Sequence, residues 1–126
     1  MSKKPHSLEH RREETKKIML KHPDKVPVIV RRLNNADPLL DKEKFLVANT
    51  FTAQEFIFVV RERLLKSNLS FRPEHAMFFF IENRMVSLHH TIGSLYKECS
   101  NEDGYLYITY SLESAFGGRG AFIERF

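Results

Sequence analysis

The sequence contains few of the residues that build cross-linked, metal-held or membrane-spanning structures. Its 126 residues include a single cysteine, Cys99, which excludes an internal disulfide and a zinc site with several thiolates. The longest apolar run covers residues 76–81 and is much shorter than the roughly 20 residues that cross a bilayer as a helix. No apolar segment of the secretory type precedes a small-residue cleavage site. We therefore expect a reduced, cytosolic protein.

Patterns typical of catalytic or metal centres are also missing. No His and Glu are spaced as in zinc proteases, and the neighbouring His89 and His90 would point apart on a strand. The glycine cluster at residues 117–120 follows a strand but precedes no helix, so it is no phosphate-binding loop. The sequence thus predicts no catalytic residue, no metal and no cofactor. A Cys99 nucleophile with a remote histidine is an alternative that no pattern supports.

The sequence does contain enough apolar material for one folded domain. A length of 126 residues suits a single core, and 42% hydrophobic, 12% aromatic and 29% charged residues are typical of a globular chain. The formal charge of +4 is concentrated in residues 1–25, and the rest of the chain is neutral. Such a basic element indicates an acidic peptide, an anionic membrane, an acidic tubulin tail or nucleic acid as partner. A solvated helix without a partner explains these charges equally well.

Local signals predict two main helices and a set of strands. Ser7 is a suitable N-cap for a helix that ends near His22, before Pro23. Thr52 and Glu55 have the spacing of a capping box, which predicts the start of a second helix. That helix should fade near residues 66–68, with strands at 26–32, 44–51, 77–81, 85–88 and 105–110, one helical turn at 92–96, and turns at 83–84 and 101–104.

The order of these elements predicts the fold class. A helix, two strands, a second helix and further strands form an α+β arrangement within one domain. Two antiparallel strands followed by a helix that crosses one face of the sheet, and then by further strands, is the β-grasp arrangement of ubiquitin. Periodicity by itself gives only the α+β class, whereas the order of elements favours the β-grasp fold.

Several motifs, in the same order along the chain, resemble the ubiquitin-like modifiers of autophagy, the family of microtubule-associated protein light chain 3 and GABA-receptor-associated protein. The resemblance spans about residues 8–118. Because the motifs are collinear, it is more specific than a single short pattern would be. The motifs are Arg11-Arg12, HPDKVPVIV at 22–30, LDKEKFLV at 40–47, MFFF at 77–80, EDGYLY at 102–107 and ESAFG at 113–117.

The resemblance implies a ubiquitin-like β-grasp core with an N-terminal helical extension, which agrees with the order of elements. The implied divisions are an N-terminal helical subdomain at residues 1–25, the ubiquitin-like core at 26–113 and a flexible C-terminal tail at 114–126. The resemblance also implies that the protein is not an enzyme and that it is a monomer before conjugation.

The resemblance further implies that the tail is processed and joined to a lipid. In the family, a cysteine protease exposes a C-terminal glycine, which activating and conjugating enzymes carry as a thioester to the amine of phosphatidylethanolamine. Gly117 matches that glycine, so cleavage between Gly117 and Gly118 would release residues 118–126. Cleavage after Gly118 is an alternative. The protein, cytoplasmic at first, would then act on the autophagosome membrane, in autophagosome formation.

A second implied function is the capture of cargo-receptor peptides of the form aromatic-x-x-aliphatic, which add a strand to the sheet edge. Without the resemblance, most of the apolar residues involved would be interpreted as core. The aromatic pocket would comprise Glu14, Ile18, Pro27, Ile29, Lys44, Leu46 and Tyr105. The aliphatic pocket would comprise Phe45, Val47, Phe51, Phe56, Val59 and Arg63. An acidic flank of the peptide would meet Arg11, Arg12, Lys25 and Lys42.

The sequence departs from the family at several positions. Ala48 replaces a proline that is usual after Leu-Val, Arg31 stands where an acidic residue is common, and a few extra residues lie within 65–72. Two other functions remain open. One is an unconjugated module that binds peptides or microtubules, with tubulin as partner. The other is an RNA-binding protein, but the basic first helix lacks interleaved aromatic residues, so no specific nucleic acid is expected.

Overall fold

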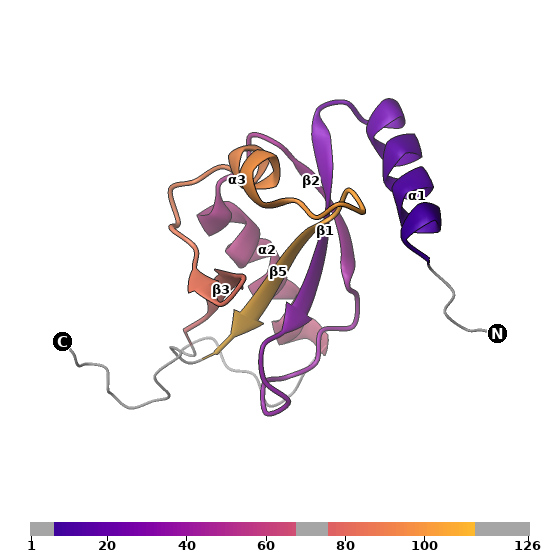
Figure 1. Cartoon of the computed structure of the whole chain (residues 1–126). Coiled ribbons are helices and arrows are strands. Elements are labelled where there is room, and N and C mark those ends of the chain that lie inside the picture. Colours follow the sequence, from indigo (N-terminus) through magenta and orange to yellow (C-terminus); the bar gives the residue numbers. More distant parts are fainter. Residues whose placement is uncertain (1–6, 68–75, 113–126) are drawn as a thin grey trace.

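Helices and strands form largely where the local sequence signals place them (Figure 1). The structure, a computed structural model, describes residues 7–67 and 76–112. Its elements combine helices with one mixed sheet, which confirms the expected α+β class. In chain order they are α1 (Leu8–Lys21), β1 (Lys25–Arg32), β2 (Lys44–Ala48), α2 (Ala53–Ser67), β3 (Phe78–Ile81), β4 (Arg84–Met85), α3 (Ile92–Cys99) and β5 (Leu106–Ser111).

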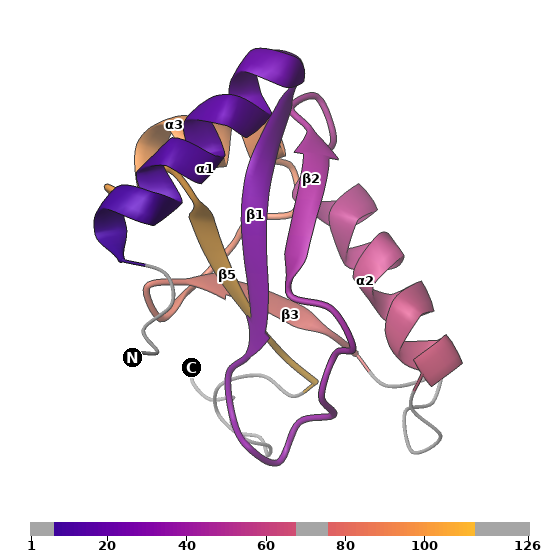
Figure 2. The same cartoon turned by 90° about the vertical axis from the view of Figure 1, so that its right-hand side faces the viewer.

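The sheet has the strand order β2-β1-β5-β3-β4. β1 pairs antiparallel with β2 and parallel with β5, while β3 pairs antiparallel with both β5 and β4. This parallel pairing of the first and last strands confirms the β-grasp arrangement. Among the residues that the structure describes, β2 pairs with β1 alone, so β2 forms one edge of the sheet. Figure 2 shows α1 and α2 on opposite sides of this part of the sheet.

Helix α1 begins and ends as its local signals predict. The Ser7 hydroxyl accepts a hydrogen bond from the backbone N–H of His10 at 3.2 Å, and the His22 N–H donates to the Ile18 carbonyl at 2.8 Å. Thr15 is the one side chain of this helix that is buried. The helix is therefore a polar element that lies against the sheet through a narrow contact.

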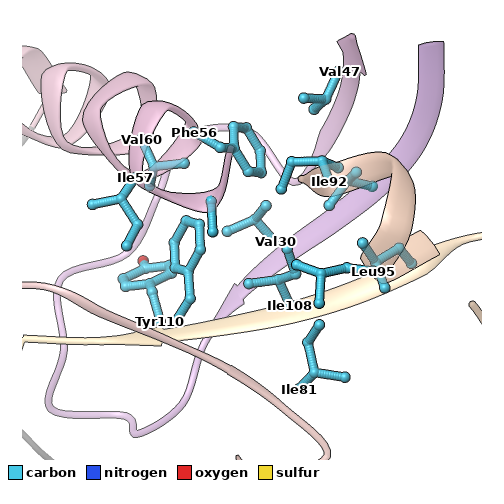
Figure 3. Close-up of a cluster of buried hydrophobic side chains, with 14 of the residues drawn as sticks. Val30, Val47, Phe56, Ile57, Val60, Ile81, Ile92, Leu95, Ile108 and Tyr110 are labelled. Atoms are coloured by element: carbon cyan, nitrogen blue, oxygen red, sulfur yellow. The ribbon is translucent and has the colours of Figure 1, made fainter. Parts of the chain in front are cut away.

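Helix α2 supplies much of the core. The predicted capping box is present: Thr52 Oγ1 accepts from the Glu55 N–H at 3.1 Å, and the Glu55 carboxylate accepts from the Thr52 N–H at 2.9 Å. Phe56, Val60 and Leu64 follow at helical spacing and are all buried. They belong to one buried cluster with side chains of β1, β5 and α3, which include Val28, Val30, Ile92, Leu95, Leu106, Ile108 and Tyr110 (Figure 3).

The hairpin after β3 differs from its prediction. The turn lies at Glu82-Asn83 rather than at residues 83–84, and the following strand is Arg84–Met85 rather than 85–88. Glu82 and Asn83 have φ angles of 52° and 66°. Two successive left-handed residues are the backbone of a tight two-residue hairpin, which fixes where β4 begins.

Two other elements also differ in extent. β2 ends at Ala48 instead of continuing to residue 51. Helix α3 begins at its Thr91 cap, whose hydroxyl accepts from the Ser94 N–H. It continues to Cys99, well beyond the predicted single turn, because Tyr96 and Cys99 also pack against the core. His89 and His90 lie in the turn before α3, beyond the strand predicted at 85–88.

Helices α1, α2 and α3 are all too short or too polar to cross a membrane. The predicted processing site at Gly117 lies outside the described residues. Of the predicted insertion at 65–72, the structure describes only residues 65–67, which form the end of α2. The predicted divisions of the chain at residues 25 and 113 stay predictions.

Candidate functional site

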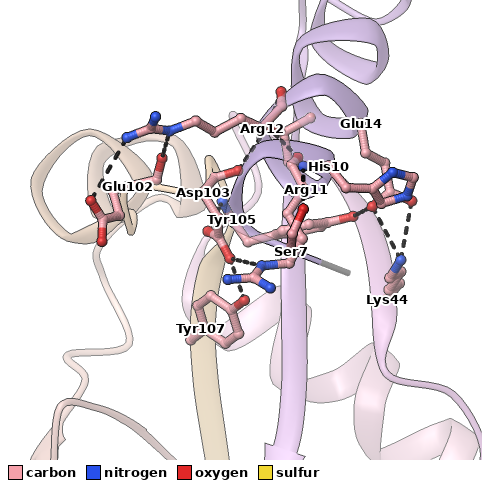
Figure 4. A network of polar contacts seen from close by, with 11 residues as sticks. Ser7, His10, Arg11, Arg12, Glu14, Lys44, Glu102, Asp103, Tyr105 and Tyr107 are labelled. Atoms are coloured by element: carbon pink, nitrogen blue, oxygen red, sulfur yellow. Dashed lines mark hydrogen bonds and ion pairs between the residues drawn. The ribbon is translucent and has the colours of Figure 1, made fainter. Parts of the chain in front are cut away.

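Helix α1 is held on the sheet by a polar network around Asp103, whose side chain is only 3% exposed (Figure 4). The carboxylate accepts hydrogen bonds from Arg11 Nε and from the Tyr105 backbone N–H, each at 2.9 Å. It also accepts from the Tyr107 hydroxyl. Thr15 Oγ1 donates to the Asp103 backbone carbonyl at 2.9 Å. These contacts join α1, the turn before β5 and β5 into one rigid unit.

The same turn makes a close backbone contact with α1. Gly104 has a φ angle of +92°, a left-handed conformation that favours glycine. A Cβ atom at this position would lie 2.2 Å from Thr15 Oγ1, so a side chain has no room there. The Gly104 carbonyl accepts from the Tyr96 hydroxyl at 2.6 Å, which ties the turn to α3.

The ionised form of Asp103 is favoured by its surroundings. Burial by itself would raise the pKa of Asp103, but the hydrogen bonds from Tyr107, Tyr105 and Arg11 and the positive charge of Arg11 outweigh burial and lower it. The contribution of the ionised Asp103 to stability is therefore fully present when the pH is above the pKa of an unfolded aspartate, about 4. This contribution is lost as the pH falls through the lower pKa of Asp103 in the folded protein.

We expect Asp103→Asn to lower the free energy of unfolding by about 1–3 kcal/mol at neutral pH, because hydrogen bonds to a charged acceptor are lost. The deficit relative to the unmodified protein should shrink as the pH falls from about 5 to about 2. Chemical denaturation of both proteins at several pH values measures this difference in the free energy of unfolding. Asp41→Asn is the control, because Asp41 pairs with Arg63 at the surface, where ion pairs contribute little. A deficit that does not change with pH would contradict this account.

A cavity of about 450 Å³ opens between α1 and the edge of the sheet. One wall is fixed by the Glu14 carboxylate, which accepts from Lys44 Nζ at 3.1 Å and from the Tyr105 hydroxyl at 2.9 Å (Figure 4). Burial and this hydrogen bond raise the pKa of Tyr105, so its hydroxyl stays protonated and donates at neutral pH. Leu46 on β2 is 40% exposed and offers apolar surface at the cavity.

The structure brings together most of the residues predicted for an aromatic pocket. Ile29, the exception, lines a neighbouring cavity of about 370 Å³, which shares Lys44 and Tyr105 with the first. That these residues bind a peptide stays a prediction. Those that line the 450 Å³ cavity are Glu14, Ile18, Pro27, Lys44, Leu46 and Tyr105.

The residues predicted for an aliphatic pocket lie on the other face of β2, on α2 and, in the case of Phe51, between these two elements. Val47 and Phe56 are buried in the core, and the Phe45 ring meets the Phe56 ring edge-on at 5.5 Å between centroids. Phe51 is half-buried and packs against this core. The more accessible members are Val59, which is 39% exposed, Phe45, which also lines the first cavity, and Arg63, which pairs with Asp41 at 2.9 Å. A ligand here would meet Phe45 and Val59 first.

The residues predicted to meet an acidic flank have different surroundings. Arg11 pairs with Asp103, and Arg12 donates to the Glu102 carbonyl at 3.0 Å, so both hold α1 in place. Lys42 lines the first cavity, with its Nζ 5.1 Å from the centroid of the Phe45 ring. Lys25 is half-buried at the start of β1.

Sequence reasoning missed three polar residues of the cavity, Lys17, Lys21 and His22. Their spacing of three or four residues from Glu14 and Ile18 places them on one side of a helix, and this signal could have found them. The four lysines of the lining, Lys17, Lys21, Lys42 and Lys44, surround the cavity with positive charge, against the single carboxylate of Glu14. The cavity therefore suits an apolar group that carries negative charge beside it.

A model of the family described as autophagy protein Atg8, ubiquitin like, matches residues 10–117. The chain belongs to the Atg8 family of ubiquitin-like proteins. Among solved structures, Trypanosoma brucei ATG8 is similar with a TM-score of 0.77 and 30% sequence identity, over 86% of this chain and 90% of that chain. Plasmodium falciparum Atg8 in complex with a Plasmodium falciparum Atg3 peptide has a TM-score of 0.75 and 33% identity, over 90% of this chain and 98% of that chain. The Atg8 match confirms the resemblance that the collinear motifs indicated.

Proposed function

We propose that this Atg8-family protein is a modifier that is conjugated through Gly117 to phosphatidylethanolamine. It acts in autophagosome formation as an adaptor rather than as an enzyme, and passes from the cytoplasm to the autophagosome membrane when it is conjugated. The family match, which ends at residue 117, supports this role. The two acyl chains of the lipid would anchor the protein stably to the membrane, whereas a single acyl chain gives only marginal membrane binding.

The proposed partners of the conjugation steps are a processing cysteine protease and activating and conjugating enzymes. An Atg3-type partner is proposed for this chain because Plasmodium falciparum Atg8 was solved with an Atg3 peptide. The same docking surface would bind cargo receptors, because their aromatic-x-x-aliphatic segments are also short extended peptides.

One observation carries the peptide-binding part of the proposal: an open sheet edge lies directly beside a cavity with an apolar floor and basic walls. β2 has one strand partner among the described residues, so its outer backbone groups are available to an added strand. Leu46 and Pro27, which are paired across β1 and β2, lie side by side in the cavity. The aromatic anchor of a peptide would enter here, and its aliphatic anchor would reach Phe45 and Val59.

We expect Leu46→Ala to weaken binding of an acidic peptide containing Trp-x-x-Leu by about 1–3 kcal/mol, or roughly 5- to 150-fold, as for residues at the centre of an interface. The leucine side chain supplies apolar contact area that alanine lacks. Isothermal titration calorimetry on the full chain measures the dissociation constant.

Leu88→Ala is the matched control, because Leu88 is 43% exposed against 40% for Leu46 but does not line the cavity. This variant should bind the peptide normally. Unchanged affinity of a folded Leu46→Ala protein would show that the peptide does not use this cavity.

A further inference from the structure

The loop between β1 and β2, residues 33–43, lies at the end of the sheet where β5 ends (Figures 1 and 2). The Leu33 backbone N–H donates to the Tyr110 carbonyl at 2.8 Å, and the Leu112 N–H donates to Asp37 Oδ1 at 3.3 Å. The Tyr110 hydroxyl donates to the Pro38 carbonyl. The β1–β2 loop is therefore bonded directly to the point at which the chain leaves its last strand.

Hydrogen bonds inside the β1–β2 loop fix its shape. Arg32 Nη1 donates to the Asn35 and Asp37 carbonyls at 3.1 and 3.3 Å, and Asp37 Oδ2 accepts from the Asn34 N–H at 3.3 Å. The Asp37 carboxylate thus accepts from two backbone N–H groups, one at each of its oxygens. Residues 33–40 contain no other ionisable side chain, so a surrounding less polar than water would desolvate no free charge in this part of the loop.

Leu39 is the large apolar side chain that the β1–β2 loop exposes. It is 63% exposed, whereas the neighbouring Leu40 is buried in the core. A single exposed leucine is common on protein surfaces and by itself indicates no partner. What distinguishes Leu39 is its position in the loop that is bonded to Leu112.

The tether between the fold and the proposed lipid is short. Gly117 follows Leu112 by five residues, which span at most about 18 Å when fully extended. A lipid joined to Gly117 therefore keeps the β1–β2 loop close to the membrane surface. Leu20, which is 84% exposed, lies at the opposite end of β1, because α1 ends just before this strand begins. The eight residues of β1 separate the two ends by about 23 Å.

We propose that the β1–β2 loop is the surface that the conjugated protein turns toward the membrane, where Leu39 enters the headgroup region of a bilayer that contains phosphatidylethanolamine. The inference rests on the proposed function, because the lipid at Gly117 supplies the tether. The charges on either side of residues 33–40 suit this partner, since cations attract lipid phosphates. Four cations and two carboxylates flank these residues: Arg31, Arg32, Lys42, Lys44, Asp41 and Glu43.

The contact should form only after conjugation. Removing one leucine side chain from water favours the membrane-facing orientation by roughly 10- to 100-fold, which is too little to hold a free protein on dilute vesicles. A short tether raises the effective concentration of the loop at the membrane, so the same gain then becomes sufficient. The tethered protein should therefore bury Leu39, and the free protein should not.

The test uses tryptophan as a reporter, because the chain contains none. In the full chain, Gly117→Cys provides a thiol that is coupled to maleimide-phosphatidylethanolamine in vesicles, and Cys99→Ala removes the native thiol. Leu39→Trp places the reporter in the β1–β2 loop, and Leu20→Trp is the matched control at the opposite end of β1. Lipids that carry bromine in the upper part of their acyl chains quench a tryptophan in the interface.

The coupled Leu39→Trp protein should lose about half of its emission, because an apolar group in the interface lies about 5–10 Å below the headgroup surface. The coupled Leu20→Trp protein and the uncoupled Leu39→Trp protein should each lose less than about a tenth. A second reporter at an exposed position of the loop, Ala36→Trp, leaves Leu39 in place and should also be quenched. Adding Leu39→Ser to that chain should reduce the quenching at least about 2-fold.

Three results would overturn this membrane-facing surface: no quenching of either loop reporter after coupling, equal quenching of Leu20→Trp and Leu39→Trp, or quenching of Ala36→Trp that Leu39→Ser leaves unchanged. The coupling needs no conjugating enzyme, so its outcome is separate from that of enzymatic conjugation. Failure of the enzymes to join Gly117 to the lipid would overturn the proposed function, whereas failure of the loop reporters would overturn this inference alone.

Discussion

Replacing Gly117 by alanine should abolish conjugation of this protein to phosphatidylethanolamine. The carbonyl of residue 117 is the acyl group that a protease thiol would attack and that later thioesters would carry. The alanine methyl group on the adjacent Cα would hinder attack of the thiol on that carbonyl. Glycine has no side chain, so the backbone can enter the narrow active-site clefts of the enzymes. We expect no lipid adduct in an intact-mass measurement after incubation with the processing and conjugating enzymes and phosphatidylethanolamine vesicles.

Two further chains make this result specific. Gly118→Ala should still be cleaved and conjugated, because Gly118 leaves with the removed tail. A chain that ends at Gly117 should be conjugated without the protease, and one that ends at Phe116 should not be conjugated. If Gly118→Ala blocks conjugation and Gly117→Ala does not, the terminal residue is Gly118. Full membrane recruitment of the chain that ends at Phe116 would favour the unconjugated adaptor.

Replacing Gly104 by alanine should lower the free energy of unfolding by about 2–5 kcal/mol, the sum of a left-handed residue other than glycine and an overpacked contact. The added Cβ would lie 2.2 Å from Thr15 Oγ1 and 2.8 Å from Thr15 Cβ, and neither atom belongs to a long flexible side chain. Helix α1 must therefore move away from the turn. Because Glu14 and Ile18 line the proposed peptide cavity, peptide affinity should fall with stability.

A double-mutant cycle with Thr15→Ala identifies the cause. Removing Thr15 Oγ1 takes away the closest atom, so the double variant should lose less stability than the two single variants together. Denaturant unfolding followed by circular dichroism measures all four proteins. Simple additivity of the two losses would show that backbone strain at Gly104, and not contact with α1, is responsible.

Helices and turns whose ends are fixed by hydrogen bonds between residues three or four apart were predictable from the sequence. Ser7 caps α1, Thr52 and Glu55 cap α2, and the turn that ends at Gly104 closes through its N–H to the Asn101 carbonyl at 2.9 Å. Each signal acts over three or four residues, so the amino-acid order alone specifies it. The extent of α3 was not predictable in this way, because burial of its apolar face against the sheet lengthens it.

The sequence by itself determined the Atg8 family, the β-grasp order and the residues that could form a peptide pocket. Only the tertiary structure decided which charges hold the fold and which remain available to a ligand. Arg11 contacts Asp103, 92 positions away in the chain, and Arg31 on β1 contacts Glu43, which lies just before β2. Local rules cannot assign such partners, because ion pairing depends on which side chains folding places within about 4 Å of each other and how far water is excluded from them.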